Sequence, residues 1–218
     1  MATFDAAARE RLLARLEPTI ASLARAGRLR GYPRNAVIVH EGEAGDDTFV
    51  LLQGRVKVYS SDLDGREITY GVIEAGDYFA DMWFDGQPRS ASVMTLEDCI
   101  CSVVPRAAME DLLASMPALA RLMLARMTAR VRTATTKLRD LALKDVYGRV
   151  VSVLEGQRGP ATVSEPVTLY PLTHQALASR VGSSREMVSR LLKDLERGGY
   201  VELGVKRITL KKKLPPRW

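Results

Sequence analysis

The stretch from Leu172 to Tyr200 reads LTHQALASRVGSSREMVSRLLKDLERGGY and contains two short amphipathic segments separated by a turn. Gly182 lies in that turn, where a glycine adopts positive φ without a steric penalty. Ala178 is small enough to let two helices cross closely. Apolar residues recur at helical spacing on both segments and form a predicted core: Leu177, Val181, Val188, Leu191 and Leu195. The stretch therefore predicts a helix-turn-helix.

The second segment of this motif also has a polar face. Its polar residues are Arg185, Glu186, Ser189 and Arg190. Arginine can bond guanine through two hydrogen bonds, and glutamate can accept one from the amino group of cytosine. We therefore expect this face to contact base edges in DNA. Glu186 has a second interpretation, because Ser183 and Glu186 also fit a capping box in which the carboxylate bonds a backbone amide.

Positive charge is concentrated in the same part of the chain. The whole chain has 32 basic and 26 acidic residues, a net charge of +6. Residues 145–218 hold 13 basic and 7 acidic residues, a difference of six, so this third carries the entire excess. A phosphate backbone attracts charge placed in this way. A basic tail at 211–213 kept only for solubility is the alternative, but the neighbouring helix-turn-helix favours DNA.

Composition limits the class of protein. The 218 residues are 46% apolar and 27% charged, which is ordinary for a soluble globular chain. No apolar run approaches the roughly 18 residues of a membrane span, and there is no export signal. We therefore expect no membrane association and a cytoplasmic location. Cys99 and Cys101 would share one face of a strand, which favours two core residues over a disulfide, with a redox sensor as the alternative.

The sequence pattern of residues 1–117 predicts a β-rich domain with flanking helices. One or two amphipathic helices are expected within residues 5–30. Asp64-Gly65 is a strong hairpin-turn signal. Short β-rich runs punctuated by glycines lie at 37–39, 49–52, 56–59, 68–73 and 99–104. Many short strands without intervening helices indicate an antiparallel barrel or roll.

Residues 118–144 predict one long helix, because this stretch contains neither glycine nor proline. Its apolar residues alternate at spacings of three and four, as in a coiled-coil seam: Leu124, Met127, Val131, Ala134, Leu138 and Leu141. A helix lying wholly on its own β-roll is the alternative. Because so long a helix needs a partner over its far half, we expect a homodimer.

Residues 145–218 predict the DNA-binding domain. Asp145 can cap a new helix, so residues 140–146 form the predicted hinge. Gly198-Gly199 ends the second helix of the motif, and the apolar runs on either side of Gly204 predict a β-hairpin wing. The expected fold class is α+β.

Three motifs resemble those of the cyclic-AMP receptor protein and fumarate-nitrate-reduction regulator (Crp/Fnr) family. They are GDYFADMWFDGQPRSASV at 76–93, LALKDVYGRV at 141–150 and LTHQALASRVGSSREMVSRLLKDLE at 172–196. The resemblance covers nearly the whole chain. It implies an N-terminal antiparallel β-roll of the cyclic-nucleotide-binding, jelly-roll type, a long dimerisation helix and a C-terminal winged helix-turn-helix. It also implies a dimeric, effector-responsive transcription regulator, not an enzyme, that binds a two-fold symmetric operator and works with RNA polymerase.

The resemblance also assigns residues that contact DNA. The family's recognition pattern R-E-x-x-x-R, which reads TGTGA-type half-sites, is matched by Arg185, Glu186 and Arg190. A second set is expected to hold phosphates, which fixes the register without reading sequence: Thr173, Gln175, Ser184 and Lys193.

The segment at 76–93 resembles the family's phosphate-binding cassette. Arg89 and Ser90 match the residues that hold a cyclic phosphate through a guanidinium and a hydroxyl. Ala80 stands where the family has glycine, and Asp81 stands where a glutamate binds the ribose hydroxyl. The cassette is also one residue short around Trp83-Phe84. These departures leave an anionic ligand as the expectation, with cyclic AMP as one candidate.

The long helix contributes to the same predicted site. The two hydroxyl residues that contact the purine in cyclic-AMP binders are matched by Ala134 and Thr135, so one hydroxyl remains. We therefore include Thr135, with Ala80, Asp81, Arg89 and Ser90, among the expected effector-binding residues.

Other effectors and activities fit the residue types less well. An iron–sulfur sensor needs about four cysteines and this chain has two. Haem needs an axial ligand such as His40 or a cysteine, because His174 belongs to the helix-turn-helix. A cupin-type oxygenase needs clustered histidine and carboxylate ligands, which two distant histidines do not supply. A Crp/Fnr-type regulator with a different effector, or a constitutive DNA binder with none, stays open.

Overall fold

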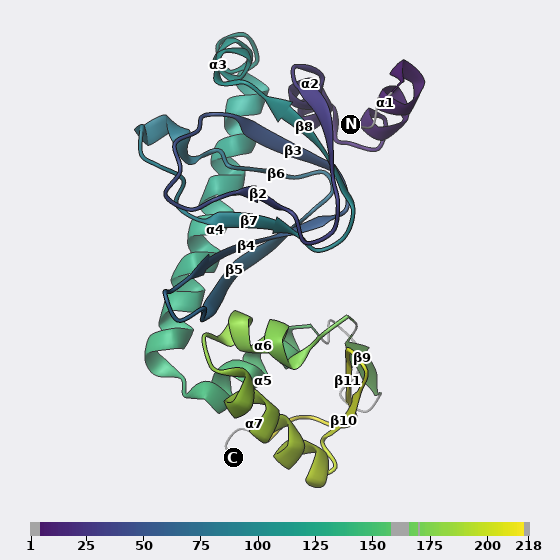
Figure 1. The fold of residues 1–218 in the computed structure, drawn as a ribbon, viewed down its shortest axis with the longest axis vertical. Coiled ribbons are helices and arrows are strands. Elements are labelled where there is room, and N and C mark those ends of the chain that lie inside the picture. Colours follow the sequence, from purple (N-terminus) through teal and green to yellow (C-terminus); the bar gives the residue numbers. More distant parts are fainter. Residues whose placement is uncertain (1–4, 158–165, 170, 216–218) are drawn as a thin grey trace. The chain divides into compact units, whose positions relative to one another are not determined.

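The computed structural model describes residues 5–157, 166–169 and 171–215. These form two compact units, described separately below. One unit contains residues 1–60 and 70–131, and the other contains residues 61–69 and 132–218. Helices and strands are labelled in Figure 1.

Two four-stranded antiparallel sheets form the β-roll (Figure 1). The first has the order β1-β8-β3-β6 and consists of Arg28–Tyr32, Cys99–Val104, Thr48–Gln53 and Tyr78–Phe79. The second has the order β2-β7-β4-β5 and consists of Val37–Val39, Ser92–Thr95, Arg55–Ser61 and Glu67–Glu74. The expected roll is confirmed. Strands β1, β6 and β7 were not predicted.

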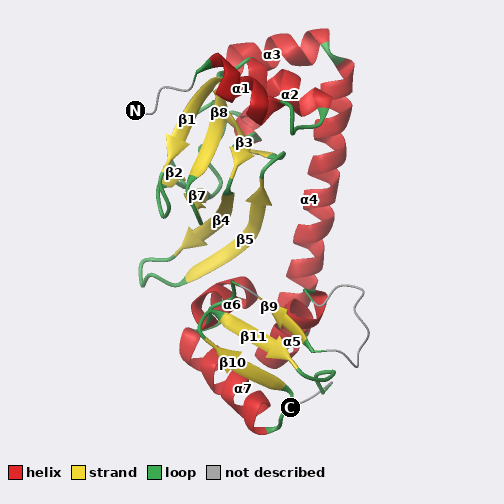
Figure 2. Cartoon of the chain, turned by 90° about the vertical axis from the view of Figure 1, so that its right-hand side faces the viewer, coloured by secondary structure: helices red, strands yellow, loops and turns green. Residues whose placement is uncertain are grey.

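Short helices lie at one end of the roll (Figure 2). They are α1 (Ala6–Leu13), α2 (Pro18–Arg25) and α3 (Arg106–Ser115). Their apolar faces pack with β3, β6 and the start of α4 (Pro117–Leu143) around a core that includes Ile20, Val50, Met109 and Leu119, each fully buried. Burial of this kind stabilises a fold by roughly 1.5–3 kcal/mol per large apolar side chain.

Cys99 and Cys101 face a second core of the roll, as expected. Both are free and buried among Phe49, Leu51 and Phe79. Burial raises the pKa of both thiols. A buried thiol with a raised pKa is a poor nucleophile, so their environment fits a core role better than a redox sensor.

Helix α4 ends at Leu143, and α5 (Val146–Gly156) begins two residues after Lys144. Asp145 caps α5 as expected, its carboxylate accepting from the Gly148 amide at 2.7 Å. The predicted hinge at 140–146 was therefore too long, because residues 140–143 are helical and only Lys144 and Asp145 separate the helices. The domain limits 1–117, 118–144 and 145–218 stay predictions.

The second unit contains the winged helix-turn-helix (Figure 2). Helices α6 (His174–Val181) and α7 (Arg185–Arg197) pack against α5 and a three-stranded sheet of order β10-β11-β9. The expected wing is the hairpin of β10 (Val201–Gly204) and β11 (Arg207–Leu210). Strand β9 (Val167–Leu169) was not predicted and adds the third strand beside β11.

Among the described residues, no single helix is long and apolar enough to cross a membrane. Helices α3 and α4 reach that length and hydropathy only as a pair bent by 110°.

Candidate functional site

The helix-turn-helix closes around the residues that its sequence pattern indicated. Gly182 adopts a φ of 61° and donates its amide to the Ala178 carbonyl, which ends α6. Leu177, Ala178 and Val181 are buried on α6. On α7 the buried residues are Val188, Leu192 and Leu195, and the predicted Leu191 packs against the same core. Leu191 is only partly buried because α7 turns its more buried face toward α5 and the sheet through Leu192.

The polar face of α7 is open to solvent. Arg185, Glu186 and Arg190 are exposed, and Ser189 is half-buried between them. Ser184 caps the helix by accepting from the Met187 amide at 3.2 Å. The expected capping box at Ser183 and Glu186 is therefore wrong, because the helix starts one residue later than that pairing requires.

Glu186 is held at the start of α7 by other contacts. Hydrogen bonds from its own backbone amide and from the Ser184 hydroxyl lower the pKa of the Glu186 carboxyl, so this side chain is ionised at neutral pH. A carboxylate in the first turn also interacts favourably with the helix dipole. Glu186 therefore presents a hydrogen-bond acceptor on the exposed face.

The four residues expected to hold phosphates lie at the starts of α6 and α7 and along α7. Thr173 caps α6 by accepting from the Ala176 amide at 3.0 Å, and Gln175 and Lys193 are exposed. The Thr173 hydroxyl accepts within the protein and keeps its own proton for a phosphate, whereas the Ser184 hydroxyl also contacts the Glu186 carboxylate. Helix N-termini carry the unpaired amides and partial positive charge that attract phosphates.

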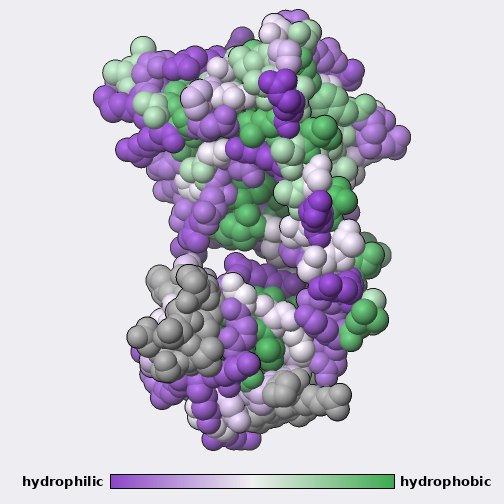
Figure 3. All heavy atoms as spheres, turned by 180° about the vertical axis from the view of Figure 1, so that it is seen from behind, coloured by the Kyte–Doolittle hydropathy of each residue, from purple (hydrophilic) through white to green (hydrophobic). Residues whose placement is uncertain are grey.

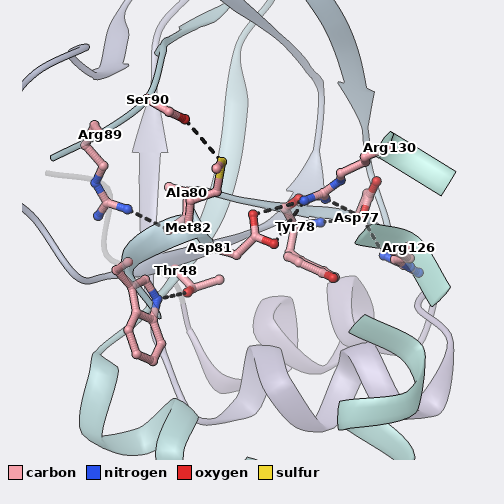
Figure 4. A network of polar contacts seen from close by, with 11 residues as sticks. Thr48, Asp77, Tyr78, Ala80, Asp81, Met82, Arg89, Ser90, Arg126 and Arg130 are labelled. Carbon is pink, nitrogen blue, oxygen red and sulfur yellow. Dashed lines mark hydrogen bonds and ion pairs between the residues drawn. The ribbon is translucent and has the colours of Figure 1, made fainter. Parts of the chain in front are cut away.

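The cassette at 76–93 gathers most of the residues expected to bind an effector (Figure 4). Arg89 is half-buried, and its guanidinium donates to the Ala80 carbonyl at 2.6 Å and the Asp47 carbonyl at 2.8 Å. Burial lowers the pKa of Arg89, although the guanidinium stays charged. Ser90 is exposed and donates its hydroxyl to the Met82 sulfur at 3.2 Å.

Asp81 forms an ion pair with an arginine that the sequence did not indicate. Its side chain is almost wholly buried, and both oxygens accept from Arg130 of α4, at 2.9 and 3.0 Å. Arg130 also donates to the Tyr78 carbonyl at 2.6 Å, and Arg126, one turn earlier, pairs with Asp77 at 2.5 Å (Figure 4). The position expected from the family resemblance to bind a ribose therefore carries an ion pair. The only signal in the sequence was the four-residue spacing that places two arginines on one face of a helix.

Tyr78 lies beneath these two arginines. The guanidinium carbons of Arg130 and Arg126 lie 4.8 and 5.5 Å from the centre of its ring. Burial raises the pKa of Tyr78 to about 12, so the phenol stays neutral. Cation–π contacts of this kind add to the ion pairs in fixing α4 against β6.

Ala80 adopts a left-handed conformation, with φ of 61°. An alanine there is strained by roughly 1–2 kcal/mol, and a glycine is not. Ala80→Gly should raise the free energy of unfolding by about 0.5–1 kcal/mol, because the relieved strain exceeds the added entropy of the unfolded chain. Urea denaturation measures this. Ala75→Gly, at an exposed position without positive φ, should lower the free energy of unfolding. A lower free energy of unfolding in both variants would contradict the inference that Ala80 is strained.

The predicted seam on α4 is exposed in the single chain. Leu124, Val131 and Leu138 are 67%, 64% and 69% exposed. Ala134 and Thr135 are exposed as well, and Met127 and Leu141 are 39% and 44% exposed. Figure 3 shows hydrophobic side chains on the surface along this helix. Leu119 and Met123, about two turns and one turn before Met127, are buried on the roll, so the apolar stripe continues beyond the intramolecular contact.

Comparison with known proteins identifies both units. A model of the cyclic nucleotide-binding domain matches residues 29–116, and a model of the Crp-like helix-turn-helix domain matches residues 148–213. The CRP-like cAMP-activated global transcriptional regulator of Mycobacterium tuberculosis is 30% identical over 200 residues, 89% of each chain. This chain belongs to the Crp/Fnr family of transcription regulators. As a Crp/Fnr regulator it is a DNA-binding protein with a cyclic-nucleotide-binding domain, and not an enzyme.

Two further relatives differ in their named effectors. The cAMP-activated global transcriptional regulator Vfr of Pseudomonas aeruginosa is 31% identical to this Crp/Fnr regulator over 181 residues, 80% of this chain and 85% of Vfr. The structure of the c-di-GMP responsive global regulator CLP from Xanthomonas campestris has a TM-score of 0.78 and 25% identity, covering 88% of this chain and 97% of CLP. The shared fold therefore accompanies two kinds of nucleotide effector.

Proposed function

We propose that this Crp/Fnr regulator is a homodimer that binds a specific DNA sequence under the control of a small anionic effector. The exposed Arg185-Glu186-Arg190 face carries the DNA part of this proposal, because its donors and acceptors match guanine and cytosine edges. The exposed seam of α4 supports the dimer. The excess of basic residues in the C-terminal third supports binding to a phosphate backbone.

A two-fold symmetric dimer requires a two-fold symmetric operator. Two recognition helices must enter successive major grooves on one face of the duplex, so the half-site centres should lie about 34 Å apart. We expect TGTGA-like half-sites, with Thr173, Gln175, Ser184 and Lys193 holding phosphates. RNA polymerase is the expected protein partner, and the cytoplasm, where a bacterial genome lies, is the expected location.

The proposed effector is an anionic nucleotide such as cyclic AMP. Arg89 supports a phosphate, because its two carbonyl partners hold the guanidinium in place and leave further N–H groups for an anion. Because Arg130 pairs with the buried Asp81 carboxylate, a ribose hydroxyl would compete with the Arg130 guanidinium for that carboxylate. Ser90 follows Arg89 in the chain and adds a hydroxyl to the proposed set, and Thr135 of α4 belongs to that set on the family resemblance. A different effector, or none, is the alternative.

The base-contacting assignment predicts two different responses to substitution. Arg185→Ala and Arg190→Ala should each weaken operator binding by about 1–3 kcal/mol and relax the preference at one base position. Lys193→Ala should weaken binding to all sequences and make affinity less dependent on salt. Sequence selection from random duplexes, followed by titration at several salt concentrations, measures both. Equal loss for all sequences in all three variants would contradict the base-contacting assignment.

A further inference from the structure

His174 joins the two helices of the helix-turn-helix at their exposed side. It is the first residue of α6, and its Nδ1 atom lies 2.9 Å from the Ser189 hydroxyl of α7. Ser189 lies on the proposed DNA-contacting face of α7, between Glu186 and Arg190. The imidazole is half-buried and therefore reaches solvent beside that face.

The charges around His174 are mostly positive. The pKa of the imidazole is lowered by burial and by two cations of α7, Arg185 and Lys193. Glu196, also on α7, raises it. The turn of the wing contacts the chain just before α6, where the Lys206 carbonyl accepts from the Leu172 amide. From α5, Arg149 donates to the Val181 carbonyl, at the opposite end of α6. His174 is therefore neutral at pH 7 in the free protein, within a positive environment suited to an anion.

We propose that His174 takes up a proton from solvent when DNA binds and pairs with a backbone phosphate. This inference rests on the proposed DNA-binding face. A phosphate beside the ring favours the charged imidazolium and offsets the repulsion from Arg185 and Lys193. In the protonated ring both nitrogens donate, so Nδ1 donates to the Ser189 oxygen and Nε2 donates to the phosphate. The Ser189 proton is then free to bond an acceptor on the DNA.

The direction of the pH dependence follows from the change in pKa. The pKa of His174 is below its usual value in the free protein and is raised by DNA. Affinity is then constant above the pKa of the bound form and rises as the pH falls through the interval between the two values. Each unit of difference contributes up to about tenfold per subunit.

The chain offers a matched control, because it contains only two histidines and His40 lies in the β-roll unit. The experiment measures binding of a fluorescein-labelled duplex carrying two TGTGA-like half-sites, between pH 6 and 8 at constant ionic strength. Wild type and His40→Gln should bind several-fold more tightly at pH 6 than at pH 8. His174→Gln should bind weakly and His174→Arg tightly, both with little dependence on pH.

A second readout measures the proton directly. The ring proton resonances of the two histidines, assigned with His40→Gln, give the pKa of His174 with and without the duplex, and a higher value with DNA is expected. An unchanged pKa, or equal pH dependence in wild type and His174→Gln, would overturn the proposal. Loss of binding by every variant at every pH would instead contradict the DNA-binding face on which it rests.

Discussion

Val131→Asp and Leu138→Asp should each convert the protein from a dimer into a monomer that binds operator poorly. Both side chains are exposed on α4 in the single chain, at 64% and 69%. In the proposed dimer each new carboxylate would be buried against its symmetry mate, and both desolvation and like charge oppose this. The cost is on the order of 3 kcal/mol or more, which raises the dissociation constant of the dimer by over about a hundredfold.

Sedimentation equilibrium measures the assembly, and circular dichroism checks that the roll stays folded. Thr136→Asp is the matched control, because it adds the same charge to an exposed position of α4 outside the seam. It should leave the dimer intact. Dimers in both seam variants, with the same dissociation constant as wild type, would place the interface elsewhere.

Arg89→Leu should abolish the response to the effector while the fold and weak nonspecific DNA binding persist. We propose that Arg89 pairs with a phosphate of the effector, and losing a charge-assisted pair of this kind costs about 2–5 kcal/mol of binding. An effector controls DNA binding only if it binds the DNA-competent arrangement more tightly. Reciprocity then requires operator DNA to tighten effector binding by the same factor.

Titration of cyclic AMP, cyclic GMP and cyclic dinucleotides, with and without operator, tests this coupling. Arg34→Leu, at an exposed arginine outside the cassette, should respond like wild type. A full response in Arg89→Leu would show that the cassette is only a scaffold. Operator affinity unchanged by every nucleotide in the wild-type protein would favour a constitutive DNA binder.

Local signals in the sequence determined the long helix, the helix-turn-helix and the family, but not strands β1, β6, β7 and β9. Gly182 ends α6 because its backbone conformation is one that glycine adopts without strain, and Asp145 starts α5 because its carboxylate bonds a nearby amide. The spacing of apolar residues predicted α4 and α7, since a helix repeats every 3.6 residues wherever it lies. Each of these signals acts between residues close in the chain, so the sequence alone is sufficient to show it.

Contacts between distant segments were decided only by the tertiary structure. Arg130 and Asp81 lie 49 residues apart, and nothing local to either indicates that they form a partly buried ion pair. Likewise, His174 meets Ser189 only because α6 and α7 cross at the angle that their core sets, and the same core buries Leu192 rather than Leu191. Apolar spacing along one helix indicates which face is buried, but which polar groups of distant segments pair depends on the packing between elements.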